Sequence, residues 1–208
     1  MNISSLFGKH SPEDIYDELA HKIILSSLNF PVSVNFIKEI NATDKQKANS
    51  GKEISYLLLH ILDRQAFQVL GQTGKDKVID EVTKKVISRY CKSILRKDTP
   101  LNLIQELACH MLSTFNERTI LYHRCQSVVD EENPWASGTM VFALSFYIHK
   151  ALGQTNRDDV DDILYGKRKL EKTDMRDFPM FTQELEISIY FGNVLAEWQI
   201  NKSLKHLR

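Results

Sequence analysis

The residues best suited to chemistry recur every three or four positions in one segment. Tyr56, His60, Asp63 and Phe67 have this spacing, with Glu53 and Arg64 beside them. At about 100° of rotation per residue, the spacing aligns them in one stripe of a helix that is otherwise apolar. An imidazole one turn from a carboxylate can act as an oriented general base or supply metal ligands. One interpretation is therefore a catalytic site built from His60, Asp63 and Arg64, with Tyr56 next to it.

A structural interpretation fits the same stripe and is the one we favour. Glu53 follows Ser50 by three positions, which is the spacing of a helix capping box. His60, Asp63 and Arg64 can satisfy one another's hydrogen bonds and hold two helices in register. Ionisable groups often have such a structural role. The two interpretations differ in whether His60 and Asp63 open into a cavity or are sealed within the bundle.

A second polar stripe lies on the long helix expected after Pro100. Glu106, His110 and Glu117 share one face of it. Carboxylates and a histidine at one-turn spacing resemble half of a metal site in a helical bundle. This stripe lies opposite the apolar side of the helix, where solvent is the expected neighbour. We therefore expect no bound metal and no cofactor, with these three residues as the weaker alternative.

Arg118 and His123 follow on the same helix, separated by four residues. This Arg-x4-His spacing resembles the active motif of the HEPN family of small helical ribonucleases. The resemblance implies that Arg118 steadies a phosphate while His123 activates or orients a ribose hydroxyl. It covers only these two positions. The alternative is a solvated arginine and a capping or interface histidine near the end of a long helix.

An acidic run near the C-terminal third has the spacing Asp-Asp-x-x-Asp, at Asp158, Asp159 and Asp162. It resembles the magnesium-binding motif of the all-helical isoprenoid synthases. The acids fall in the first turn of an expected helix, where negative charge favourably opposes the helix dipole. The dipole alone explains them.

The elements that must position these residues are all expected to be helices. With only 8 glycines and 5 prolines, breaks are few and fall at helix boundaries. We expect helices at 12–28, from Pro31 to about 40, 51–70, 73–96, from Thr99 beyond Tyr122, 140–152, 156–165 and after Pro179, with a loop at 130–137 anchored by Trp135. The pattern predicts an all-α, single-domain bundle over 1–208. It has about seven or eight helices, with central ones near 51–70 and 138–152.

Composition narrows the class of protein. Hydrophobic residues make up 42% and charged residues 26%, which is typical of a chain that folds completely. Lys plus Arg and Asp plus Glu each number 27, which argues against a general nucleic-acid binder but leaves room for a local basic patch.

Cysteine usage and hydropathy bear on the compartment. Cys91, Cys109 and Cys125 form no CxxC and leave one cysteine over, which fits a reducing compartment. The first ten residues have no pattern typical of a secretory signal. The purest apolar run, 140–148, is shorter than the roughly 20 residues of a bilayer span. We expect a cytoplasmic protein with no membrane partner.

These observations favour a protein that acts by binding and has no catalysis of its own. The expected partner is another protein or a second copy of the chain. The alternative is a small hydrolase or ribonuclease that uses His60, Asp63 and Arg64, or Arg118 with His123. Whether the protein is an enzyme, and which small molecule it would take, are left open by the sequence.

Overall fold

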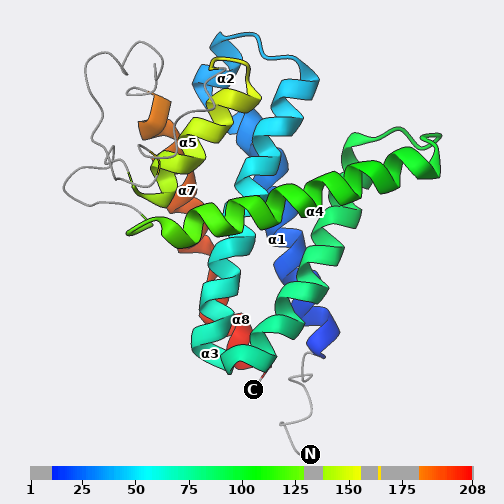
Figure 1. The fold of residues 1–208 in the computed structure, drawn as a ribbon, viewed down its shortest axis with the longest axis vertical. Coiled ribbons are helices and arrows are strands. Elements are labelled where there is room, and N and C mark those ends of the chain that lie inside the picture. The colour runs from blue at the N-terminus through cyan, green and yellow to red at the C-terminus, as the bar shows by residue number, and fades with distance from the viewer. Residues whose placement is uncertain (1–10, 129–137, 156–163, 165–182, 208) are drawn as a thin grey trace, which may run out of the picture.

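The computed structural model describes residues 11–128, 138–155, 164 and 183–207. Their secondary structure is helical, which confirms the predicted all-α fold (Figure 1). The helices are α1 (Pro12–Ser33), α2 (Asn35–Glu39), α3 (Asp44–Ile94), α4 (Leu101–Arg124), α5 (Met140–Ala151), α7 (Gln183–Trp198) and α8 (Ile200–Lys205). Within these described ranges, no helix combines the length and the hydropathy needed to span a bilayer.

α1 begins at the predicted residue, Pro12, and runs further than expected. The Ser11 hydroxyl accepts a hydrogen bond from the Asp14 amide, and the Asp14 carboxylate accepts one from the Ser11 amide. The predicted end at residue 28 is wrong, because the helix continues through Pro31 to Ser33. Pro31 lies in the last turn, where the ring forgoes one backbone hydrogen bond and the helix can still close. The Val34 amide then donates to the Phe30 carbonyl and ends it.

α3 is a helical hairpin whose two limbs are joined at Gly71. Gly71 has φ 70° and ψ −173°, which breaks the helix at the predicted position. A first limb, 44–70, and a second limb, 72–94, therefore run side by side in opposite directions (Figure 1). The Tyr90 hydroxyl donates to the Ala48 carbonyl at 2.5 Å and joins the far ends of the two limbs.

The start of the first limb corrects the sequence analysis. The predicted capping box of Ser50 and Glu53 is wrong, because the cap is Thr43, whose hydroxyl accepts from the Gln46 amide. Glu53 lies three turns inside the helix. Its carboxylate is therefore available for a contact with another helix.

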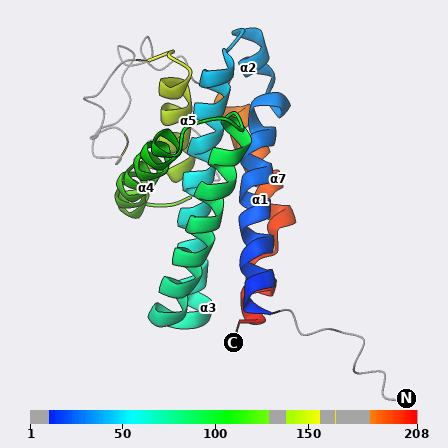
Figure 2. The ribbon, with the colours of Figure 1, turned by 90° about the vertical axis from the view of Figure 1, so that its right-hand side faces the viewer.

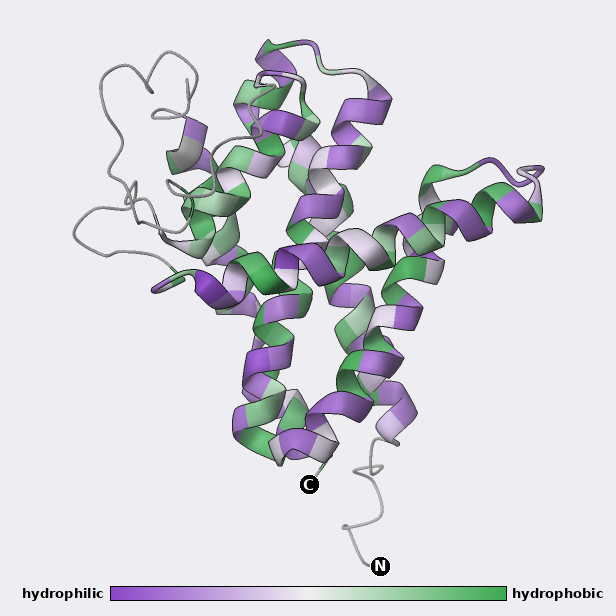
Figure 3. Ribbon diagram, viewed as in Figure 1, coloured by the Kyte–Doolittle hydropathy of each residue, from purple (hydrophilic) through white to green (hydrophobic). Residues whose placement is uncertain are grey.

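The remaining helices cover the hairpin. α4 crosses both limbs of α3 (Figure 1). α5 is buried over nearly all of its circumference, as predicted for a central helix. Polar and apolar bands alternate along α3 and α4 at the helical repeat (Figure 3). The core that results contains side chains from every helix, for example Leu19, Leu57 and Met111.

α7 lies along α1 on the other side of the hairpin (Figure 2). The Tyr190 hydroxyl donates to the Ser26 carbonyl at 2.5 Å, and the Tyr190 ring meets the Phe30 ring edge-on at 5.2 Å. The side of α7 that faces the core contains the buried residues Ile187, Phe191, Val194 and Trp198. The predicted loop at 130–137 with Trp135 and the acidic run at 158–162 lie outside the described residues.

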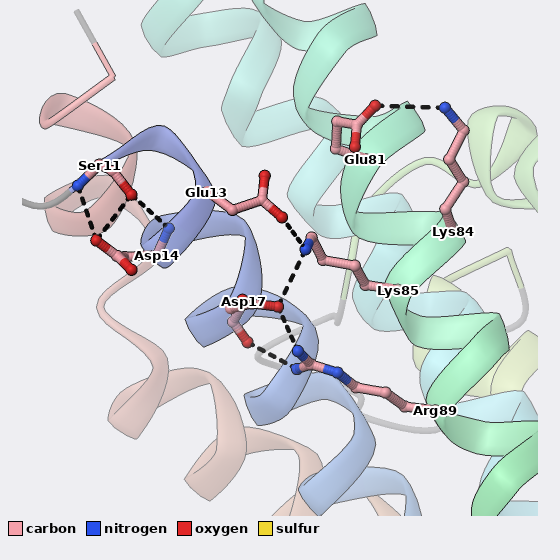
Figure 4. Close-up of polar contacts among 8 residues, drawn as sticks. All are labelled: Ser11, Glu13, Asp14, Asp17, Glu81, Lys84, Lys85 and Arg89. Carbon is pink, nitrogen blue, oxygen red and sulfur yellow. Dashed lines mark hydrogen bonds and ion pairs between the residues drawn. The ribbon is translucent and has the colours of Figure 1, made fainter.

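A charged network joins α1 to the second limb of α3 (Figure 4). Lys85 pairs with Glu13 and, at 3.1 Å, with Asp17. Arg89 pairs with Asp17 and donates to the Asp17 carbonyl at 3.0 Å. Exposed ion pairs contribute little stability each, so the network chiefly fixes the register of the two helices.

Candidate functional site

His60 lies at the centre of the fold, on the first limb of α3. Its side chain is 0% exposed, and neither ring nitrogen has a hydrogen-bond partner among the described residues. The ring lies 4.8 Å from the His123 ring and 5.5 Å from the Tyr122 ring, between centroids. Burial, with smaller effects of His123 and Arg64, lowers the pKa of His60 to about 3. In this position the imidazole is neutral at pH 7 and does not reach solvent, where a substrate would be.

A cavity of about 510 Å³ lies beside His60, and we call it the His123 cavity. It is lined by Asp63, Arg64, Phe67, Gln68, Gln72, Lys75 and His123. The structure thus brings together part of the α3 stripe and the histidine of the Arg-x4-His pair. Asp63 pairs with the Lys75 ammonium at 3.3 Å. Of the predicted catalytic group, Asp63 and Arg64 open into a cavity, while His60 is sealed behind it.

A second cavity, of about 500 Å³, lies where α3, α4 and α5 meet, and we call it the Arg118 cavity. It is lined by Asn49, Lys52, Glu53, Tyr56, His110, Thr114, Glu117, Arg118, Tyr147, Lys150 and Ala151. Arg118 Nε donates to Glu53 Oε2 at 2.8 Å, and Arg118 Nη2 donates to Glu53 Oε1 at 3.0 Å. The guanidinium carbon lies 3.3 Å from the centroid of the Tyr147 ring. One arginine therefore ties the three helices together.

Within the Arg118 cavity, Arg118 and Glu53 neutralise each other, and Lys52, Lys150 and Glu117 also contribute charge to the lining. Burial disfavours the charge of Arg118, but the Glu53 carboxylate outweighs it and raises the Arg118 pKa above its ordinary value. Burial, followed by the nearby Glu53 charge, raises the pKa of Tyr56. Tyr56 is therefore a neutral phenol, 3% exposed and hydrogen-bonded to Thr114. The arrangement is suited to holding helices together, because the guanidinium is already occupied.

Arg118 and His123 open into different cavities. Five residues along a helix correspond to side chains about 140° apart around its axis. Arg118 accordingly contacts Glu53 and Tyr147. His123 instead lines the neighbouring His123 cavity and contacts the His60 ring behind it. The two groups of the Arg-x4-His pair do not face one common ligand position within this chain.

The weak metal candidates do not form a ligand set. Glu106, His110 and Glu117 are exposed on α4. The Glu117 carboxylate accepts a long hydrogen bond from Ser113 at 3.5 Å. Across the residues that the structure describes, no three His, Cys, Asp or Glu side chains gather in a way that could hold a metal ion.

Sequence reasoning missed Tyr147 and assigned Glu53 to a cap. The available signal in the sequence was that Glu53 directly precedes a mainly apolar run, 54–62, and the structure buries all of this run. A carboxylate at the head of such a run needs a cationic partner. The sequence did not indicate that this partner is Arg118.

An exposed apolar face lies on α1 and α7, and we call it the α1–α7 face. Its large side chains are 38–61% exposed and comprise Leu25, Leu28 and Val32 on α1 and Leu185 and Ile189 on α7. A groove of about 470 Å³ runs between the two helices beside them.

Comparisons with known proteins found no match for this chain. The chain matches no family model, no curated protein sequence and no solved structure. Its function has to be argued from the cavities and surfaces alone.

Proposed function

We propose that this protein acts by binding, and that the partner on its α1–α7 face is a second copy of the chain. The observation that supports this is the row of half-exposed side chains: Leu25, Leu28 and Val32 follow one side of α1, and Leu185 and Ile189 follow α7. Scattered apolar residues are normal on a surface, but a contiguous group on two adjacent helices is typical of an interface.

The low charge of this face favours a homotypic partner, since Glu186 and Glu197 are the only charged residues among the described residues that line its groove. Residues 23–37 and 187–196 contain no Asp, Glu, Lys or Arg, in a chain that is 26% charged. The neighbouring Glu186 carboxylate is held by the amides of Asn35 and Phe36, at 2.6 and 3.4 Å. Interface centres are depleted of charged residues. Glu197 also lines the groove, at its border, so like charge between two such faces is confined to few carboxylates.

The shape of the face is compatible with two-fold symmetry. The row on α1 that carries Leu28 and Val32 stands next to the groove lined by Leu25 and Ile189. In an isologous dimer the same patch is used by both copies, so a ridge beside a groove can be complementary to itself. The row of one copy would occupy the groove of the other.

Sedimentation velocity over a range of concentrations tests the dimer. We expect the full chain to dimerise, and Val32→Glu to remain monomeric at the concentrations where the parent is dimeric. Leu103→Glu is the matched control, since Leu103 is a half-exposed leucine on α4. A parent that is monomeric throughout, or a dimer that survives Val32→Glu, would overturn the proposal.

A second candidate function is hydrolysis of a phosphodiester, as in a small ribonuclease, at the His123 cavity. The observation that favours it is the meeting of Asp63 and Arg64 from α3 with His123 from α4. His123 is exposed and can exchange a proton with a bound substrate, and the Arg64 guanidinium can hold a phosphate. In this proposal neither His60 nor Arg118 is a catalytic group.

Cleavage of a single-stranded RNA oligonucleotide by the purified chain tests the second candidate. We expect His123→Gln to abolish cleavage and His110→Gln, an exposed histidine on the same helix, to keep it. An intact oligonucleotide with the parent chain, or undiminished cleavage by His123→Gln, would rule it out.

A further inference from the structure

We propose that the His123 cavity binds a nucleoside phosphate, with the base against Phe67 and the phosphate against Arg64. This inference rests on the cavity that the hydrolase proposal uses and names its ligand class. It requires binding alone, so it can hold without any cleavage.

The hairpin of α3 explains why these side chains converge. Gly71 reverses the chain, so that Lys75 from the start of the second limb meets Asp63 on the first limb. Arg64 and Phe67 lie on the same stretch of the first limb, and α4 closes the cavity with His123. The cavity volume of about 510 Å³ is in the range of small-molecule sites, which measure roughly 300–1,000 Å³.

Phe67 gives the cavity an apolar surface for a planar group. Its side chain is 53% exposed, and it is the one aromatic ring among the large hydrophobic residues that are exposed in the described part of the chain. The other lining residues are polar or charged, so the ring is not there to complete a core. Bases stack on such rings because every base has a π face.

The charges around Phe67 favour an anion. The lining contains the cations Arg64 and Lys75 against the single carboxylate of Asp63. Lys75 is shared between Asp63 and Asp76, at 3.3 Å from each. Arg64 is exposed and forms no ion pair with any residue that the structure describes. The uncompensated charge of Arg64 therefore lies at the rim of the cavity, where a phosphate can form two parallel hydrogen bonds with it.

Two amides complete the recognition. Gln68 and Gln72 line the cavity and can each donate and accept hydrogen bonds. The Gln72 amide nitrogen already donates to both Asp76 carboxylate oxygens, at 2.9 and 3.0 Å. These bonds do not use the Gln72 carbonyl oxygen, which can accept a hydrogen bond from a base or a ribose hydroxyl.

The test compares three probes by isothermal titration calorimetry with the full chain. Adenosine 5′-monophosphate carries both groups, adenosine lacks the phosphate, and ribose 5-phosphate lacks the base. We expect the monophosphate to bind more tightly than either fragment. Phe67→Ala should weaken the monophosphate by roughly tenfold or more, as the loss of one stacked base predicts, and leave ribose 5-phosphate unchanged.

A second variant isolates the phosphate contact. Arg64→Gln should weaken the monophosphate and ribose 5-phosphate and leave adenosine unchanged. Lys77→Gln, an exposed lysine outside the cavity, is the control and should bind all three probes as the parent does. A monophosphate that binds no better than ribose 5-phosphate, or that is indifferent to Phe67→Ala, would overturn the inference. Binding without RNA cleavage would support it and rule out only the hydrolase.

Discussion

Arg118 and Glu53 meet through two parallel hydrogen bonds, although they are 65 residues apart in the chain. Both side chains are little exposed, at 13% and 10%. The Tyr147 ring covers the guanidinium from a third helix. A buried pair of this kind costs desolvation energy and repays it only if both partners are present. The pair therefore specifies how α3, α4 and α5 pack more than it adds net stability.

The first prediction concerns removal of one partner or both. Arg118→Met leaves the Glu53 carboxylate buried without a cation, and we expect it to lower the free energy of unfolding by about 3–5 kcal/mol. The double variant Glu53→Leu with Arg118→Met removes both charges and keeps the volume, so it should be more stable than the single variant. Urea unfolding followed by circular dichroism measures both.

The control for the Arg118 and Glu53 variants is an exposed ion pair on α3. Lys84 and Asp80 form an i,i+4 ion pair at 2.6 Å with both side chains more than half exposed. Lys84→Met should lower stability far less than Arg118→Met does, because solvent screens an exposed pair. A double variant that is no more stable than Arg118→Met would contradict the interpretation.

The helices could be predicted because their signals are local. The start of the first helix at residue 12, the break between residues 70 and 73 and the enclosed segment at 140–152 depend on residues a few positions apart, and each was confirmed. The two boundary errors both concern a residue that could begin a helix but does not. Ser50 and Pro31 are both compatible with a helix start, but Thr43 provides an earlier cap and tertiary packing carries α1 past Pro31.

Of the residues around the His123 cavity, only those on a single helix could be grouped from the sequence. The predicted stripe on α3 contained Asp63 and Phe67, with Arg64 beside it, and these three line one cavity because they share a face of the helix. The stripe also contained Tyr56 and His60, which the structure places in the Arg118 cavity and in the core. The addition of His123 depends on how α4 crosses α3, which no local pattern encodes. The sealing of His60 depends on the same crossing, since its neighbours are Tyr122 and His123.

The second prediction is a pH dependence that originates in His60. Its pKa falls from 6.5 to about 3 on folding. Between these values the unfolded chain binds a proton that the native chain does not, so stability is fully present above pH 6.5 and decreases as the pH falls. The slope approaches about 1.4 kcal/mol per pH unit for this one group. Urea unfolding at pH 7.5, 6.5 and 5.5 measures it.

Two variants separate His60 from the other titrating groups. His60→Phe removes one imidazole and should reduce the loss of stability between pH 6.5 and 5.5, whatever it does to stability at pH 7.5. His149, whose pKa burial lowers to about 4, retains its own contribution to the slope. His21→Gln, at an exposed position on α1, should leave the slope as in the parent. A slope that is unchanged in His60→Phe would assign the dependence to other groups.

The third prediction tests the close approach of α1 and α3. A Cβ at Gly51 would lie 2.5 Å from the Ser27 carbonyl oxygen, which is backbone and cannot move aside. Gly51→Ala should therefore destabilise the protein by about 1–3 kcal/mol, despite the better helix propensity of alanine.

Gly192 lies inside α7 with no heavy atom within 4 Å of the position its Cβ would take. Gly192→Ala should instead stabilise by up to about 1 kcal/mol. Urea unfolding of the two variants at pH 7.5 distinguishes them, and equal effects of the same sign would mean that the helices do not approach as closely as described.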